Sequence, residues 1–363
     1  MTDTAHMRHA LGLAARGLGR TWPNPAVGCV IVQGNRIVGR GWTQPGGRPH
    51  AETVALAQAG AQARGATAYV TLEPCDHHGQ TPPCSAALIM VGISRVVTAL
   101  TDPDPRVTGR GHARLRAAGL QVTEGVLADA ARRLNAGFLK RVTLGLPMVT
   151  LKLATTLDGR IATASGESRW ITGTLARRAT HALRLTHDAV LVGAGTARAD
   201  NPDLTARDLG AGHQPLRIVL DPRLTLRPDS RLGQTARQNP VWLLHTASAS
   251  DAARTAWTAT GATLLETPHT PTGQIDLPAA LTALADRGLT RILCEGGATL
   301  AANLIRANLV DDLITYTAGA LIGAEGHPAL GPLHVASLAK APRLSLLSTR
   351  QIGPDTETHW TFR

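Results

Sequence analysis

The stretch that decides the fold of the first domain covers residues 49–91 and reads PHAETVALAQAGAQARGATAYVTLEPCDHHGQTPPCSAALIMV. Apolar residues recur with helical spacing over 50–59, and the apolar run 68–72 is typical of a buried strand. After a polar loop, residues 84–91 again predict a helix. The stretch is therefore expected to form a helix, a strand, a loop and a second helix, with His, Glu and Cys residues where these elements begin or end.

Four of these residues predict a catalytic zinc site: His50, Glu52, Cys75 and Cys84. One His and two Cys suit a zinc ion that keeps its fourth position for water, and zinc lowers the pKa of that water to about 7. Glu52 follows His50 by two residues, so its carboxylate can face the water and pass the proton to a ring nitrogen and a leaving amine. The order matches the H-x-E and P-C-x-x-C signature of zinc deaminases, except that eight residues separate the two cysteines.

A closed structural zinc site is the alternative for the same residues. His77 or His78 would then supply the fourth ligand, and Glu52 would have no role. The other two cysteines, Cys29 and Cys294, lie in apolar runs and are expected to be buried strand residues.

The amino-acid composition limits the classes of partner that the chain is expected to bind. The net charge of +11 favours an anionic partner, but the arginines that supply it are scattered, and no run of five or six basic residues indicates a nucleic-acid tail. With only two Tyr and two Phe residues, stacking platforms for single strands are scarce as well. We therefore expect no nucleic-acid partner. No apolar run approaches the roughly 20 residues that span a bilayer, and no signal peptide is recognised, so we expect a cytoplasmic protein without membrane contact.

A length of 363 residues predicts two domains, and Gly145 and Pro147 mark the boundary, giving domains 1–145 and 146–363. The first domain alternates strands and helices, which predicts an α/β sandwich with a mostly parallel sheet and one continuous helix over 127–141. The second domain also alternates. Its expected strands are 148–154, 189–192, 216–220, 241–244, 290–294 and 313–318, and its expected helices are 174–186, 277–287 and 298–307.

Two glycine-containing turns in the second domain are candidates for a phosphate site. Residues 193–198 (GAGTAR) follow a strand but place Arg198 where a dinucleotide fingerprint has its third Gly. Residues 295–300 (EGGATL) fit better, because a strand, a glycine turn and a helix present backbone N–H groups to an anion. A tight turn that merely needs glycine is the alternative.

Longer motifs resemble one family. The segment TLEPCDHHGQTPPC (71–84), the flanking motifs NPAVG (24–28) and PHAE (49–52), and the later motifs KLATTLDGR (152–160) and SGESRWIT (165–172) are similar to those of the bifunctional riboflavin-biosynthesis deaminase/reductases, the RibD type. This resemblance covers essentially the whole chain. It implies a cytidine-deaminase-like three-layer sandwich followed by a dihydrofolate-reductase-like domain.

The same resemblance implies two reactions. The first domain would remove an amino group hydrolytically from a diaminopyrimidinone that carries a ribosylamino 5′-phosphate, and the second would reduce the ribosyl group of the resulting aminouracil to ribityl with NADPH. The expected cofactors are one Zn²⁺ per chain and NADPH. The expected partners are the phosphorylated pyrimidine and further copies of the chain, bound through the reductase domain.

The resemblance also implies roles for single residues. Lys152 and Asp200 are candidates for polar groups near the hydride acceptor. A Lys in an apolar strand is unusual, with snorkelling as the alternative, and the alternative for Asp200 is a turn or cap residue. The implied NADPH contacts are Ala154, Trp170, Thr196, Asp200 and Gly297. The implied substrate contacts are Asn24 at the pyrimidine ring and, in the second domain, Ser168, Arg184, Leu204, Arg207 and Glu295.

Three residues depart from the family pattern: Thr43 stands where His is usual, Asp76 where a small polar residue is usual, and Gln80 where a basic residue is usual. None is a predicted zinc ligand, so these departures concern substrate binding. Two other functions stay open at this point. One is a deaminase of tRNA or single-stranded DNA bases with an accessory domain, and the other is a bifunctional enzyme with only one active domain.

Overall fold

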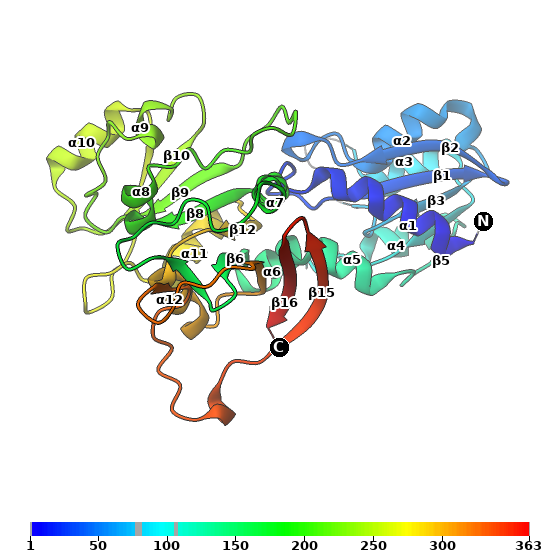
Figure 1. Cartoon of the computed structure of the whole chain (residues 1–363). Helices are drawn as coiled ribbons and strands as arrows, with labels where there is room; N and C mark the ends of the chain where they lie inside the picture. The colour runs from blue at the N-terminus through cyan, green and yellow to red at the C-terminus, as the bar shows by residue number, and fades with distance from the viewer. Residues whose placement is uncertain (1, 77–81, 105–107, 363) are drawn as a thin grey trace. The chain divides into compact units, whose positions relative to one another are not determined.

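The computed structural model describes residues 2–76, 82–104 and 108–362. The chain divides into two compact units, Met1–Leu146 and Pro147–Arg363. Both mix helices with a sheet, as Figure 1 shows, so the prediction of an α/β protein is confirmed.

The N-terminal unit is built on a five-stranded sheet of order β2-β1-β3-β4-β5. Its strands are β1 Gly28–Gln33, β2 Arg36–Trp42, β3 Thr67–Val70, β4 Arg95–Thr98 and β5 Gln121–Thr123. Its α-helices are α1 Asp3–Ala14, α2 Ala51–Ala59, α3 Cys84–Val91, α4 Arg110–Ala117, α5 Ala128–Leu134 and α6 Ala136–Leu144, with 3-10 turns η1 Ala15–Gly17, η2 Pro45–Gly47 and η3 Gly60–Ala63.

Two sets of helices cover the sheet of this unit. Helix α2 packs on α3 and α3 on α4, whereas α1 packs on α5. Glycine lets both sets approach the sheet closely, because a Cβ at Gly28 would lie 1.9 Å from the Ala10 carbonyl oxygen of α1 and a Cβ at Gly41 2.1 Å from the Ala51 carbonyl oxygen of α2. A continuous buried apolar cluster between these layers gives the three-layer sandwich that the family resemblance implied.

Two details of this unit differ from expectation. The sheet is not mostly parallel: β1 runs antiparallel to both β2 and β3, and only the β3-β4 and β4-β5 pairs are parallel. The reason is that β1 and β2 form a hairpin, which needs no helical crossover. The expected helix over 127–141 is divided at Asn135 into α5 and α6, because the buried Asn135 side chain bonds the backbone of Ala26 in both directions.

The C-terminal unit contains a nine-stranded sheet of order β11-β10-β9-β8-β12-β6-β13-β16-β15 (Figure 1). The strands from β11 to β13 in this order are parallel, and β16 and β15 close the edge as an antiparallel hairpin. The strands are β6 Met148–Thr156, β8 Ala189–Gly193, β9 Leu216–Leu220, β10 Val241–His245, β11 Thr263–Glu266, β12 Arg291–Cys294, β13 Asp312–Ala318, β15 Leu344–Ile352 and β16 Asp355–Phe362.

Helices connect the parallel strands of this unit, and a small second sheet lies beside them. The α-helices are α7 Thr174–Leu185, α8 Ala194–Asp200, α9 Arg231–Gln234, α10 Asp251–Ala259, α11 Leu277–Asp286 and α12 Ala298–Arg306. The small sheet pairs β7 Arg160–Ala162 with β14 His327–Pro328, and η4 spans Leu338–Lys340. Cys29 and Cys294 are fully buried strand residues, as expected.

His187, at the turn before β8, predicts how acid affects the stability of this unit. Its Nδ1 lies 2.7 Å from the Leu183 carbonyl oxygen and its Nε2 2.9 Å from the Thr150 hydroxyl, partners that a neutral ring satisfies. Burial, and secondarily the charge of Arg291, lowers the pKa of His187 to about 3. The unfolded chain, with a His pKa of about 6.5, therefore binds more protons between these two values, so stability falls as the pH drops through that window.

Between pH 7 and pH 5, we expect wild type to lose about 2 kcal/mol more unfolding free energy than His187→Gln. At pH 5 the pH lies about 1.5 units below the unfolded-state pKa of about 6.5, and each unit is worth about 1.36 kcal/mol. Chemical denaturation at the two pH values measures the difference. Equal losses in the two proteins would contradict the prediction.

Candidate active sites

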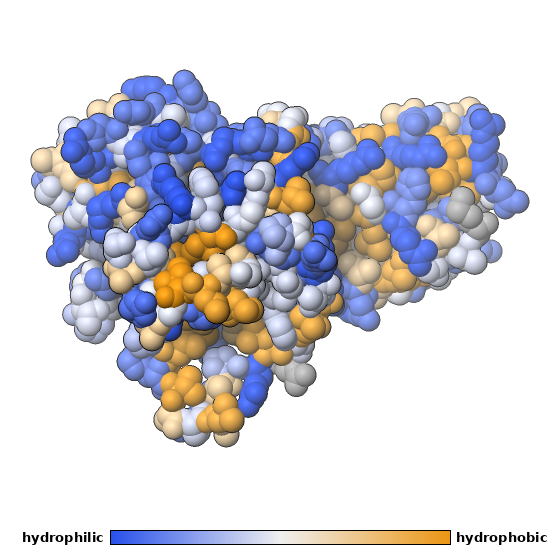
Figure 2. Space-filling view, viewed as in Figure 1, coloured by the Kyte–Doolittle hydropathy of each residue, from blue (hydrophilic) through white to orange (hydrophobic). Residues whose placement is uncertain are grey.

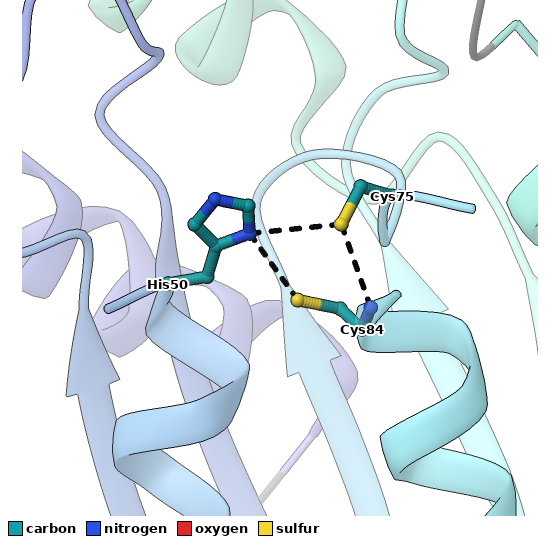
Figure 3. Close-up of side chains that lie close together, drawn as sticks. All are labelled: His50, Cys75 and Cys84. Atoms are coloured by element: carbon teal, nitrogen blue, oxygen red, sulfur yellow. Dashed lines mark hydrogen bonds between the residues drawn. The ribbon is translucent and has the colours of Figure 1, made fainter. Parts of the chain in front are cut away.

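In the N-terminal unit, three side chains from separate elements converge on one point (Figure 3). His50 is the N-cap residue of α2, Cys84 is the first residue of α3, and Cys75 lies in the loop that leaves β3. The His50 Nδ1 lies 3.3 Å from the Cys84 Sγ and 3.6 Å from the Cys75 Sγ. The backbone N–H of Cys84 donates to the Cys75 Sγ at 3.4 Å, so the start of α3 supports this thiolate.

The spacing of these atoms fits zinc. Tetrahedral zinc, with bonds of about 2.0 Å to nitrogen and about 2.3 Å to sulfur, holds such ligands about 3.5 Å apart. Both nitrogen–sulfur distances fall close to that value. Among the residues that the structure describes, this is the one group of His, Cys, Asp and Glu residues with donor atoms close enough together to hold a metal ion. His77 and His78, the fourth ligands of the closed-site alternative, lie outside the described residues.

The electrostatics of the three ligands favour metal binding. Hydrogen bonds from the Cys84 thiol and from His50 lower the pKa of Cys75 to about 4, against the opposing effect of burial. The pKa of Cys84 is raised, because its thiol proton is held by Cys75 and its surroundings are buried. One thiolate is therefore already stable at neutral pH, and a divalent cation replaces the shared proton when it binds.

Glu52 lies in the first turn of α2, and its side chain is buried. Burial, followed by the charge of Cys75, raises the pKa of Glu52 to about 7. A carboxyl group with a pKa near neutrality both accepts and donates a proton readily. The structure thus places Glu52 beside the three ligands and gives it the properties of a proton-transfer group.

Glu73 anchors the backbone of a neighbouring loop and helix next to this site, a role that the sequence did not predict. Its carboxylate accepts backbone N–H bonds from Asp102, Gly109, Gly111 and His112, at 2.9 to 3.3 Å. It therefore binds the loop after β4 and the start of α4 to the segment that carries Cys75. The signal available in the sequence was a Glu that directly follows an apolar strand and precedes a predicted zinc ligand by two residues, since a carboxylate near a core requires hydrogen-bond partners.

The positions that depart from the family pattern have structural partners. The Thr43 side chain is buried, and its Oγ1 accepts the Val27 N–H at 3.0 Å. Asp76 accepts from Ser85 and from Arg114, the latter at 2.8 Å. Thr43 thus bonds the backbone before β1, whereas Asp76 bonds side chains of α3 and α4. Gln80 lies outside the described residues.

Several of the predicted residues of the C-terminal unit lie towards the carboxyl ends of three neighbouring parallel strands, β8, β12 and β6. This edge is where open parallel sheets bind ligands. Lys152 and Ala154 lie in β6. Thr196 and Asp200 lie in α8, directly after β8, whereas Glu295 and Gly297 follow β12.

A buried ion pair dominates this edge. The Arg184 guanidinium of α7 donates two hydrogen bonds to Glu295, from Nε at 2.6 Å and from Nη2 at 2.9 Å, and a third to the Thr205 carbonyl at 2.7 Å. The two side chains are only 11% and 10% exposed. Burial by itself would raise the pKa of Glu295, but the charge and hydrogen bonds of Arg184 outweigh the effect of burial, so the pKa of Glu295 is lowered. Burial also lowers the pKa of Lys152, and the negative charge of Glu295 partly offsets this decrease.

The turn at residues 295–297 leads into α12, with Gly297 as the N-cap residue. The Gly297 N–H donates to the Thr196 hydroxyl at 3.0 Å, which joins the two predicted glycine turns. The segment 193–198 itself is not an open loop, because α8 begins at Ala194.

The remaining predicted residues occupy varied positions. Trp170 is 68% exposed and stacks under the Arg177 guanidinium at 4.8 Å, and Ser168 is half-buried. Asp200 faces Arg169 at 3.9 Å. Leu204 belongs to the buried apolar core of the unit, whereas the Arg207 side chain is half exposed. Arg207 is therefore more accessible to a solvent-borne ligand than Arg184.

Comparisons with known proteins match both units. The model of the cytidine and deoxycytidylate deaminase zinc-binding region matches residues 1–100, and the model of the RibD C-terminal domain matches residues 147–358. The chain is 43% identical to the riboflavin biosynthesis protein RibD of Escherichia coli (strain K12), over 99% of each chain.

Solved structures agree with these sequence matches. Acinetobacter baumannii RibD, form 1, is 38% identical with a TM-score of 0.89, and covers 99% of both chains. A diaminohydroxyphosphoribosylaminopyrimidine deaminase/5-amino-6-(5-phosphoribosylamino)uracil reductase from Thermotoga maritima is 32% identical with a TM-score of 0.86, again over 99% of both chains. In the described part of the chain, no helix combines the length and the hydrophobicity needed to cross a membrane.

These relatives cover 99% of the chain, and the two family models match the unit that holds the zinc-type site and the reductase unit. They do not favour a nucleic-acid base deaminase with an accessory domain. The chain belongs to the RibD family and is a bifunctional deaminase and reductase of riboflavin biosynthesis.

Proposed function

We propose that residues 1–145 deaminate 2,5-diamino-6-ribosylamino-4(3H)-pyrimidinone 5′-phosphate and that residues 146–363 reduce the product, 5-amino-6-(5-phosphoribosylamino)uracil, with NADPH. The observation that carries the proposal is the placement of Glu52 beside a His50, Cys75 and Cys84 group with zinc spacing. The Thermotoga maritima relative is named for a deaminase and a reductase of these two substrates.

In the deaminase, His50 Nδ1 and the thiolates of Cys75 and Cys84 would hold one zinc ion per chain. When bound, zinc lowers the pKa of a water molecule to about 7. The Glu52 carboxylate takes one proton of the attacking water and delivers it to the pyrimidine ring nitrogen, where it stays. It then carries the second proton, from the hydroxyl group now on the ring carbon, to the amine, which leaves as ammonia while the oxygen stays on the ring as a carbonyl. Asn24 contacts the pyrimidine ring and orients it.

In the reductase, NADPH supplies a hydride when bound. Gly297 and Thr196 bind its phosphates at the start of α12, where backbone N–H groups attract anions, and Ala154, Trp170 and Asp200 bind the rest of the cofactor. Ser168, Leu204 and Arg207 contact the substrate, and the accessible Arg207 guanidinium suits its 5′-phosphate. Arg184 holds Glu295, and Lys152 and Glu295 place polar groups at the sugar that accepts the hydride.

We also propose that the chain self-associates through its reductase unit. Several apolar side chains of this unit are exposed, including Leu321 at 73%, Leu338 at 77% and Leu346 at 52%. Figure 2 shows apolar residues over the projecting segment between β14 and β15. In addition, β15 is an edge strand of the large sheet. Exposed apolar side chains and sheet-edge strands are both typical of protein–protein interfaces.

The test follows ammonia release and NADPH oxidation separately in purified, zinc-loaded protein given the diaminopyrimidinone. We expect ammonia first and NADPH oxidation after it. After zinc is removed with a chelator, ammonia release should cease, while reduction of added deaminated intermediate continues. If the zinc-loaded protein reduces the added intermediate but releases no ammonia, only the reductase is active. If it performs neither reaction, the proposal is overturned.

A further inference from the structure

The loop that leads to His50 contains two consecutive glycines in the left-handed region, Gly46 at φ 75° and Gly47 at φ 86°. Their surroundings differ sharply. A Cβ at Gly46 would meet nothing within 4 Å, whereas a Cβ at Gly47 would lie 1.8 Å from the Nδ2 and 2.6 Å from the Cγ of Asn24. The amide of Asn24 therefore occupies the space that a side chain at position 47 would fill.

Both backbones at this contact are fixed. The Gly46 N–H donates to the Arg20 carbonyl at 2.8 Å, and the Gln44 N–H donates to the Pro49 carbonyl at 3.1 Å. Thr21 holds the other loop, since its carbonyl accepts the Asn24 N–H at 2.9 Å and its hydroxyl donates to the Asn24 carbonyl at 3.1 Å. Neither loop can withdraw freely, so a side chain at position 47 has to displace the amide of Asn24.

We propose that Gly47 is a positioning residue of the deaminase, whose missing side chain sets the orientation of the Asn24 amide relative to the segment that carries His50. The inference rests on the proposed function, in which Asn24 contacts the pyrimidine ring. An amide carries a donor on one side and an acceptor on the other, so its rotation presents the wrong group to the ring. Gly47 acts through Asn24 and touches neither the metal ligands nor Glu52 in this role.

Gly46→Ala and Gly47→Ala form a matched pair of variants. Both place alanine in the left-handed region, and only the second displaces Asn24. We expect Gly46→Ala to keep a kcat/KM for ammonia release close to wild type, and Gly47→Ala to lose about 100-fold, as expected for a substrate misplaced by about an ångström. Zinc affinity, measured by chelator competition, and NADPH-dependent reduction of added intermediate should be unchanged in both.

A double variant tests whether the effect passes through Asn24. In an Asn24→Ala background the amide is gone. The Cβ of an alanine at position 47 would then be crowded only by the Cβ of residue 24, at 2.9 Å. We expect Gly47→Ala to cost little more there, so the two single losses should not add. Full additivity, equal losses in the two glycine variants, or zinc loss in Gly47→Ala would each overturn the inference.

Crystal structures of the two glycine variants separate this inference from the proposed function. We expect the Asn24 amide to be displaced in Gly47→Ala and unmoved in Gly46→Ala. If wild type releases no ammonia from the pyrimidine but the amide is displaced as expected, the proposed substrate fails and the positioning contact stands. An unmoved Asn24 in Gly47→Ala overturns the inference whatever the kinetics.

Discussion

Replacement of Glu52 by glutamine is expected to reduce deamination by about 10²- to 10⁴-fold while leaving zinc binding and the reductase intact. The glutamine amide would keep the shape of the buried side chain but neither accept nor release a proton near neutral pH. Three other residues supply the metal-binding group, so the variant should retain its zinc. Ammonia release under saturating substrate measures the loss.

Asp129→Asn is the matched control, because it makes the same carboxylate-to-amide change in the same unit at a side chain that is 98% exposed. It should release ammonia like wild type. When Glu52→Gln receives the deaminated intermediate, NADPH oxidation should proceed at the wild-type rate. Normal ammonia release by Glu52→Gln would remove the proton-transfer role from this residue.

Arg184→Met is expected to destabilise the reductase unit by about 3 to 5 kcal/mol and to abolish NADPH-dependent reduction. The substitution leaves the Glu295 carboxylate nine-tenths buried without its cation and also removes a hydrogen bond to the Thr205 carbonyl. The cost is that of a buried charge that has lost its partner, which exceeds the net value of the original pair. Denaturant unfolding of the unit and reduction of supplied intermediate provide the two measurements.

Two comparisons identify the cause of that loss. Arg227→Gln breaks an ion pair whose side chains are 81% and 61% exposed, and should leave the stability close to that of wild type because solvent screens the pair. Removing both charges, in Arg184→Met with Glu295→Gln, should restore part of the stability but no activity. A similar cost for Arg184→Met and Arg227→Gln would refute the assignment of a buried, energetically coupled pair.

Local patterns predicted much of the fold. The helices over 50–59 and 84–91 and most of the parallel strands of the second unit follow from hydrophobic periodicity, which reflects burial on one or both faces. The hairpin of β15 and β16 was not predicted, because β15 is an edge strand with mostly exposed residues and so lacks a buried apolar face. The division between α5 and α6 was missed for a related reason: it depends on Asn135, whose partner, Ala26, is 109 residues away in the chain.

For the sites, the sequence by itself determined which residue types were available. A His, a Glu and two Cys at element ends are informative locally, because their chemistry is unusual in such positions. Only the tertiary structure decided which groups meet. Arg184 pairs with Glu295 across 111 residues, Glu73 holds the loop after β4, and Gly47 leaves room for the Asn24 amide. These contacts depend on strand order and on the paths of separate loops, and periodicity along one segment carries no information about either.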